Sequence, residues 1–223
     1  MNGAFFMNRN ILIKAIREEL ESGEIRKDLF PMITDFGVRD YSETVHTMGL
    51  NYITAIGRTI NGVTAVSECP VYPYEKNENF INQEKRVAEI SLGYKLPKET
   101  EVRPDSIWYS KTENKPLLLS EFERCDNSRL KNKKLEEKIQ NLLISYHQLG
   151  GEVPLILFVY WTYSKVTPGD ISSYIRIFDD GFTTNNGKKI YGIDGRKTDY
   201  LIYHCVATGD KENLTLNQWI KVR

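Results

Sequence analysis

The chain has 223 residues with 30 basic and 30 acidic side chains, so its formal net charge is zero. That balance excludes a protein that coats nucleic acid through bulk positive charge, although a local basic patch could still bind it. With 40% apolar and 27% charged residues, the composition is that of a globular protein with a real core, and the length suits a single domain over residues 1–223.

Cysteine usage and hydropathy indicate where the protein is expected to act. Cys69, Cys125 and Cys205 are widely spaced and include no CxxC pair, which argues against a zinc knuckle or a disulfide framework. The first ten residues lack the basic and apolar regions of a signal peptide. No apolar run approaches the roughly 20 residues that a membrane span needs. We therefore expect reduced thiols in a cytoplasmic protein that does not enter a membrane.

The first part of the chain predicts two helices and a strand. Apolar side chains at helical spacing predict a helix over 10–21 and a longer one over 41–60, for which Ser42 is the predicted N-cap. Residues 24–40, between these helices, have no regular pattern. Alternation of apolar and polar residues then predicts a strand over 63–71.

Residues 72–102 carry many charges and are predicted to be an insertion between two strands of one sheet, with a short helix over 79–91. Strands are predicted over 103–110 and 117–124. The polar segment Lys111 to Lys115 separates them, which predicts a hairpin with a loop of about five residues.

The clearest helical pattern covers 131–149 and ends at Gly150-Gly151. The near-continuous apolar run over 153–163 predicts a central strand that is buried on both faces. A C-terminal extension, 165–223, is predicted to add a helix over 172–178, a turn over 185–189 and a strand over 200–207, with the tail through Trp219 packing across an edge.

This order of elements predicts an α/β fold in which helices flank a mixed central sheet, with an αβββαβ core over about 41–163. Because strand side chains alternate, Glu121 and Glu123 share one face of their strand. Pairing through the hairpin turn is expected to bring Asp105 opposite them. Three acids would then meet at one end of the hairpin.

Carboxylates packed so closely repel one another and are costly to desolvate without a partner. Basic side chains or a divalent cation such as Mg²⁺ would offset that cost. For an isolated Glu-x-Glu, a solvated strand end paired with lysines is the simpler alternative.

The stretch that runs from Pro104-Asp105 through an apolar strand into Glu121-Phe122-Glu123 resembles the core motif of the PD-(D/E)XK nuclease superfamily, the restriction endonuclease-like fold. The order of elements from Tyr41 to Tyr163 also fits the αβββαβ core of that family. The resemblance implies a metal-dependent phosphodiesterase, a deoxyribonuclease in which Mg²⁺ or Mn²⁺ binds the attacking water.

Carried onto this chain, the resemblance implies that Asp105 and Glu121 bind the metal and that Glu43, on the first core helix, completes the site. Glu123 would orient or deprotonate the water. Glu123 also marks a departure, because the family has lysine at this position. Some restriction endonucleases with Glu-x-Glu are active, whereas in other members loss of the lysine accompanies loss of activity. Four basic residues could take over the role of the lysine: Arg124, Lys131, Lys138 and Lys111.

A basic run follows the acids directly in the sequence. Cations of this kind supply much of the affinity for a nucleic-acid backbone. The equally weighted alternative is a solvated helix start, in which Glu136 and Glu137 balance the lysines. The predicted nucleic-acid contacts are Arg124, Arg129, Lys131, Lys134 and Lys138. The histidines, His46, His147 and His204, have no ligand spacing and support no histidine-based mechanism.

Two other functions stay open. A non-catalytic DNA-binding protein on the same fold, of the kind that regulates plasmid replication or transfer, would use the acidic strand and the basic helix without cutting. A protein-interaction module that binds no nucleic acid is compatible with the zero net charge. A homodimer also stays open.

Overall fold

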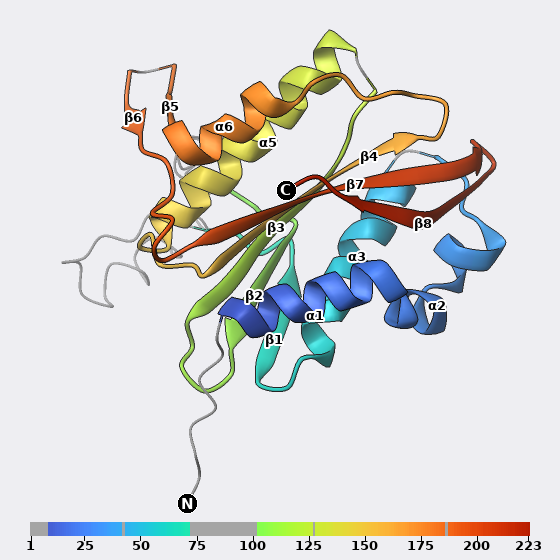
Figure 1. Cartoon of the computed structure of the whole chain (residues 1–223), viewed down its shortest axis with the longest axis horizontal. Helices are drawn as coiled ribbons and strands as arrows, with labels where there is room; N and C mark the ends of the chain where they lie inside the picture. Colours follow the sequence, from blue (N-terminus) through green and yellow to red (C-terminus); the bar gives the residue numbers. More distant parts are fainter. Residues whose placement is uncertain (1–8, 42, 72–101, 127, 186) are drawn as a thin grey trace, which may run out of the picture.

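The structure is a computed structural model that describes residues 9–41, 43–71, 102–126, 128–185 and 187–223. The predicted N-cap Ser42 and the helix predicted over 79–91 lie outside these residues. The described part is a six-stranded mixed sheet with helices on both faces (Figure 1). The predicted fold class, an α/β fold with helices around a mixed sheet, is therefore confirmed.

The central sheet combines an antiparallel and a parallel part. Its strands, in spatial order, are β1 (Val63–Ser67), β2 (Ser106–Ser110), β3 (Pro116–Arg124), β4 (Leu155–Tyr163), β7 (Asp199–Asp210) and β8 (Asn213–Lys221). β1, β2 and β3 are antiparallel neighbours, β3, β4 and β7 are parallel, and β8 returns antiparallel along the edge. The C-terminal extension thus contributes two strands to the same sheet. A separate small hairpin joins β5 (Phe182–Thr183) to β6 (Lys189–Ile190).

Four of the helices flank the sheet: α1 (Arg9–Ser22), α3 (Thr44–Thr59), α5 (Arg129–Gln148) and α6 (Ser172–Asp180). α1 and α3 lie on one face, and α5 and α6 lie on the other (Figure 1). Side chains of the hairpin divide between the two apolar clusters. Trp108 and Phe122 pack with α1 and α3, whereas Ile107 and Leu119 pack with α5 and α6. Because side chains alternate along a strand, Glu121 and Glu123 are directed toward the α5 side.

The segment 24–40, predicted to be irregular, contains α2 (Glu24–Leu29) and the π-helix η1 (Met32–Phe36). The prediction was wrong because the interactions that stabilise these helices involve residues outside the segment. Glu19, on the preceding helix, accepts a hydrogen bond from the backbone N–H of Arg26 at 3.1 Å and so satisfies a free donor at the start of α2. Arg26 itself is only 3% exposed, and tertiary contacts of this kind do not appear in a periodic pattern.

The strand predicted over 63–71 is shorter in the structure. β1 ends at Ser67, and Glu68 adopts a positive φ of 49°, a conformation that interrupts a strand. Val71 then pairs with Val102 through backbone hydrogen bonds of 2.8 and 3.3 Å. Val71 and Val102, which lie on either side of residues 72–101, are therefore direct neighbours.

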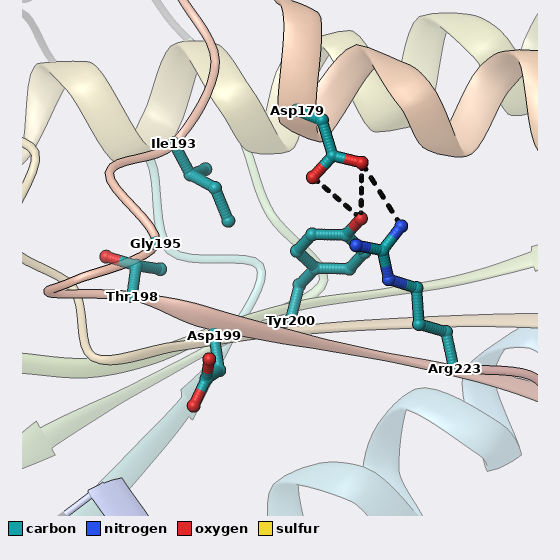
Figure 2. A pocket seen from close by; sticks show the side chains of 7 residues that line it. All are labelled: Asp179, Ile193, Gly195, Thr198, Asp199, Tyr200 and Arg223. Carbon is teal, nitrogen blue, oxygen red and sulfur yellow. Dashed lines mark hydrogen bonds and ion pairs between the residues drawn. The ribbon is translucent and has the colours of Figure 1, made fainter.

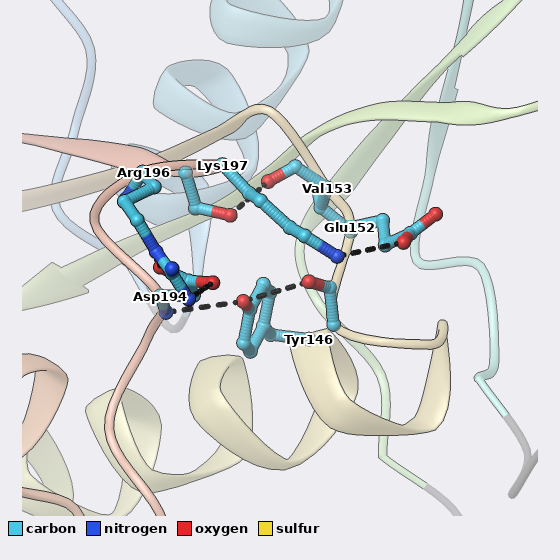
Figure 3. A network of polar contacts seen from close by, with 8 residues as sticks. Tyr146, Glu152, Val153, Asp194, Arg196 and Lys197 are labelled. Atoms are coloured by element: carbon cyan, nitrogen blue, oxygen red, sulfur yellow. Dashed lines mark hydrogen bonds and ion pairs between the residues drawn. The ribbon is translucent and has the colours of Figure 1, made fainter.

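A polar network fixes the C-terminal end of α5 (Figure 3). The Tyr146 hydroxyl donates to the carbonyl oxygen of Gly151 at 2.8 Å and accepts from the backbone N–H of Asp194 at 3.3 Å. Lys197 forms an ion pair with Glu152 at 2.9 Å. These contacts tie the turn after α5 to the segment that precedes β7, and they hold the helix in a set direction over the sheet.

None of the three cysteines, all of which the structure describes, forms a disulfide. Cys125 and Cys205 are buried, and Cys69 is half-buried. In the described ranges, no helix has the length and apolar character needed to cross a membrane.

Candidate functional site

Asp105 and the glutamates of β3 meet at the end of the β2–β3 hairpin. Ser106 pairs with Ser120, so Asp105, one residue earlier, lies beside Glu121. The backbone N–H of Phe122 donates a hydrogen bond to Asp105 Oδ2 at 2.7 Å. Asp105 is 5% exposed and Glu121 is fully buried, so both carboxyl groups are held in the interior.

Two lysines of α5 neutralise these acids. Lys138 Nζ lies 2.8 Å from Glu121 Oε2 and 3.6 Å from Asp105 Oδ1. Lys134 Nζ lies 3.0 Å from Glu123 Oε2. Residues four apart share one face of a helix, so the two lysines approach the strand in parallel. Both were predicted to contact nucleic acid, and the structure instead places their ammonium groups on the acids of β3.

α3 contributes a histidine that the sequence pattern did not single out. His46 Nε2 lies 3.5 Å from Asp105 Oδ1. Glu43, the α3 residue that the family resemblance favoured, is exposed just before the helix begins. Within the described part of the chain no contact joins Glu43 to Asp105. His46 follows one helical turn later on about the same face, and that spacing was the only signal that could have suggested it.

Burial and charge together set the ionisation of the cluster. Burial raises the pKa of Glu121 well above its ordinary value, and the neighbouring Asp105 carboxylate raises it further. Burial alone would lower the pKa of Lys138, but Glu121 and Asp105 outweigh that effect and raise it. The ammonium of Lys138 is therefore retained across the physiological pH range. Oε1 of Glu121 is buried and has no hydrogen-bond partner among the described residues.

Asp105 and His46 shift each other's ionisation in the directions expected of an ion pair. Burial would raise the pKa of Asp105, but the hydrogen bond from His46 and the charge of Lys138 lower it. Burial would lower the pKa of His46, but the hydrogen bond and the charge of Asp105 raise it above its ordinary value. This pair therefore favours a charged carboxylate and a protonated imidazole.

Arg124, another predicted nucleic-acid contact, is held by protein groups. Its guanidinium lies 5.4 Å from the ring centre of Trp161 and 4.9 Å from that of Tyr163. It also lies 3.5 Å from Asp40 Oδ2 and 3.6 Å from Asp126 Oδ2. Two aromatic rings and two acids therefore hold this guanidinium at the C-terminal end of the central strand β3.

The remaining basic candidates lie on the outside of the fold. Arg129 is exposed and Lys131 is half-buried in the first turn of α5. Lys111 is exposed in the turn between β2 and β3, whereas Glu121 lies near the far end of β3. Five residues of strand between Pro116 and Glu121 span about 17 Å. Of the four residues that could replace the family's lysine, the structure brings Lys138 to the acids and keeps Lys111 away from them.

Within the residues that the structure describes, no group of three or more histidine, cysteine, aspartate and glutamate side chains is arranged to bind a metal ion. The site consists instead of two carboxyl groups that converge on one ammonium, with His46 beside them. Asp105 and Glu121 are the two side chains that could bind a cation here.

A polar pocket lies around the first residues of β7, away from the acidic cluster (Figure 2). Because β3, β4 and β7 are parallel, this is the opposite end of the sheet from Glu121 and Glu123. The Asp179 carboxylate accepts hydrogen bonds from the Tyr200 hydroxyl at 2.9 Å and from the Arg223 guanidinium at 3.1 Å. Asp179 and Arg223 pair with each other, and Asp199 pairs with Arg9 of α1 at 2.9 Å, so we assign no active site to this pocket.

Comparison with protein-family models, with curated proteins and with solved structures found no match to this chain.

Proposed function

We propose that the protein is a Mg²⁺- or Mn²⁺-dependent endonuclease that hydrolyses phosphodiester bonds of DNA. The observation that supports this proposal is the convergence of three side chains. Lys138 Nζ lies 2.8 Å from Glu121 Oε2 and 3.6 Å from Asp105 Oδ1. Carboxylates that can bind a metal, next to a fixed positive charge, are the groups that phosphodiester hydrolysis requires.

The donor atoms fit a hard divalent cation. Carboxylate oxygens are the ligands that Mg²⁺ prefers, and the ion commonly takes one or two of them and completes its shell with water and phosphate oxygens. Asp105 and Glu121 supply two carboxylates, and Oε1 of Glu121 is buried without a hydrogen-bond partner among the described residues. When bound, the cation would lower the pKa of a water ligand and neutralise charge on the phosphate.

The other residues of the cluster have roles that follow from their contacts. Lys138 supplies the lysine that the family motif has at position 123, and its ammonium stabilises negative charge beside Glu121. His46 positions Asp105 through their contact of 3.5 Å. Glu123, oriented by Lys134 at 3.0 Å, orients the attacking water. Glu43 is exposed, and in this proposal His46 takes its place as the contribution of α3.

Cleavage of supercoiled and linear DNA with Mg²⁺ or Mn²⁺, beside an EDTA control, tests the proposal. We expect the wild-type protein to cut and Glu121→Gln and Asp105→Asn each to lose about 100-fold or more in rate. Glu24→Gln is the matched control, because Glu24 is an exposed glutamate at the start of α2, and it should cut normally. A folded wild-type protein that cuts no DNA with either metal would overturn the proposal, as would cutting that persists in EDTA.

One observation favours a second candidate, a non-catalytic DNA-binding protein that regulates replication or transfer. Lys134 and Lys138 already neutralise the acids, so the cluster does not need a metal for charge balance. This candidate predicts DNA affinity that survives EDTA and falls steeply with salt, without cleavage under any condition. Either function implies DNA as the partner and the cytoplasm as the compartment, and a homodimer is compatible with both.

A further inference from the structure

A groove of about 530 Å³ lies between α5 and α6. It is lined by Arg129, Asn132, Lys133, Glu136 and Tyr174. The four residues from α5 are spaced i, i+3, i+4 and i+7, so they form one face of that helix. The volume lies within the range of about 300–1,000 Å³ that is typical of sites for small ligands, and it can hold a short stretch of a single strand.

The groove adjoins the acidic site through the same turns of α5. Lys133 lines the groove, and the next residue, Lys134, forms an ion pair with Glu123 at 3.0 Å. Successive residues of a helix are about 100° apart around its axis. One side of the helix therefore holds the acids of β3, and the adjacent side presents the groove.

The two basic side chains of the groove can bind a ligand, because no buried acid among the described residues holds them, whereas Lys134 and Lys138 face the acids of β3. Within the described ranges Arg129 forms no ion pair, and its side chain is exposed. Lys133 has one contact, with Glu137 at 3.7 Å, and the two side chains are 73% and 56% exposed. Such an exposed pair holds its partners weakly. Lys134 and Lys138, by contrast, are paired with buried carboxylates.

We propose that this groove binds a single nucleic-acid strand beside the acidic site, with Arg129 and Lys133 on its phosphates. The inference rests on the proposed function and specifies the strand that the site would act on. Arg129 and Lys133 lie one turn apart, and neutralising phosphates is the main source of sequence-independent affinity. Tyr174 forms the α6 wall with a half-buried ring, and a tyrosine ring offers a surface on which a base can stack.

The polar residues of the groove complete this assignment. Asn132 is half-buried in the lining and can both donate to and accept from a base. Glu136 accepts a hydrogen bond from Gln140 at 3.4 Å. Its negative charge disfavours a phosphate at that end of the groove, so the phosphates belong at the Arg129 end and the amino group of a base near Glu136.

Binding of a fluorescent single-stranded oligonucleotide in EDTA, followed by anisotropy over a range of salt, tests the proposal without requiring cleavage. We expect Arg129→Gln/Lys133→Gln to weaken binding about tenfold or more and to reduce the salt slope by about 1.4, since each single-strand phosphate contact contributes about 0.7. Tyr174→Leu should weaken binding without changing the slope.

The matched control is Lys14→Gln/Arg196→Gln. Lys14 is 74% exposed with an i,i+4 partner at 3.6 Å, which closely matches Lys133, and Arg196 is an exposed arginine next to an acid. This control should bind as the wild type does. Equal binding by the groove and control variants would overturn the proposal, as would displacement of the strand by an equal concentration of an acidic peptide.

The same proteins assayed for cleavage separate this inference from the proposed function. If the wild type cuts and the groove variant binds the strand normally, the groove assignment is wrong and the nuclease proposal stands. If the groove variant loses binding but nothing cuts, the strand site stands and the catalytic proposal fails.

Discussion

Lys138 Nζ lies 2.8 Å from Oε2 of Glu121, a residue with no exposure to solvent. The two residues are 17 positions apart in the chain, one on the central helix of one face and the other on a central strand. A fully buried carboxylate in contact with an ammonium is stable only while both partners are present. The pair therefore couples the stability of the fold to the charge of the candidate site, and several consequences can be measured.

The first prediction concerns the stability that Lys138 gives to the native state. Lys138→Met should lower the free energy of unfolding at about pH 8 by about 3 kcal/mol, because it leaves the buried Glu121 without a partner. The loss should shrink as the pH falls through the pKa of Glu121, which burial and Asp105 hold well above its ordinary value, because the protonated carboxyl group needs no cation. Urea unfolding across that pH range measures both effects.

The double variant Glu121→Gln/Lys138→Met provides the control. Removing both charges should recover much of the stability that Lys138→Met loses, and a double-mutant cycle gives the coupling between the two residues. Additive effects of the two substitutions would contradict the prediction.

The second prediction concerns pH and the contact between His46 and Asp105. The pKa of His46 is raised above its ordinary value of 6.5, so the contact stabilises the fold at lower pH, and this contribution is lost as the pH rises through the raised pKa. The pKa of Asp105 is lowered from 3.8, so the contribution is also lost as the pH falls through that lowered value.

Comparison of the wild-type protein with His46→Gln measures this window. The difference in unfolding free energy should be larger at about pH 5.5 than at about pH 9, because His46 is protonated in the folded state only at the lower of these values. A difference in unfolding free energy that is larger at about pH 9 than at about pH 5.5 would show that Asp105 does not raise the pKa of His46.

The third prediction separates the two candidate residues at the start of α3. His46→Gln should lower metal-dependent cleavage about tenfold, as is typical when a residue that positions a metal ligand is changed. Glu43→Gln should change cleavage little, because Glu43 is exposed and, within the described ranges, is not in contact with Asp105. The reverse order of the two rates would instead identify Glu43 as the residue that completes the metal site.

The fourth prediction tests the close approach of α3 to the sheet. A Cβ at Gly57 would lie 2.6 Å from the Trp108 ring and 2.7 Å from Ala65 Cβ, so Gly57→Ala should destabilise the protein by about 1–2 kcal/mol in thermal or urea unfolding despite its better helix propensity. Gly195→Ala is the matched control, because a Cβ there would meet nothing within 4 Å. Equal stability of the two variants would show that α3 can shift without cost.

The sequence by itself determined the elements whose pattern is periodic and local. Apolar spacing predicted the helices α1, α3 and α5, and apolar or alternating runs predicted strands of the central sheet. A short helix was also predicted where α6 lies. Together they gave the αβββαβ order and the mixed sheet. The hairpin spacing also predicted that Asp105 and Glu121 would meet, because strand pairing and alternation follow from chain geometry alone.

Only the tertiary structure decided which residues complete the site. In the sequence, Lys138, Lys111 and Arg124 were equally good candidates for the role of the family's lysine. The packing of α5 over β3 decides among them, because it brings the Lys138 ammonium to Glu121. The helix α2 and the contact between His46 and Asp105 were likewise missed. Each depends on groups brought together from separate elements. Contacts of this kind leave no period in the sequence, because their energy comes from burial and charge in the folded state.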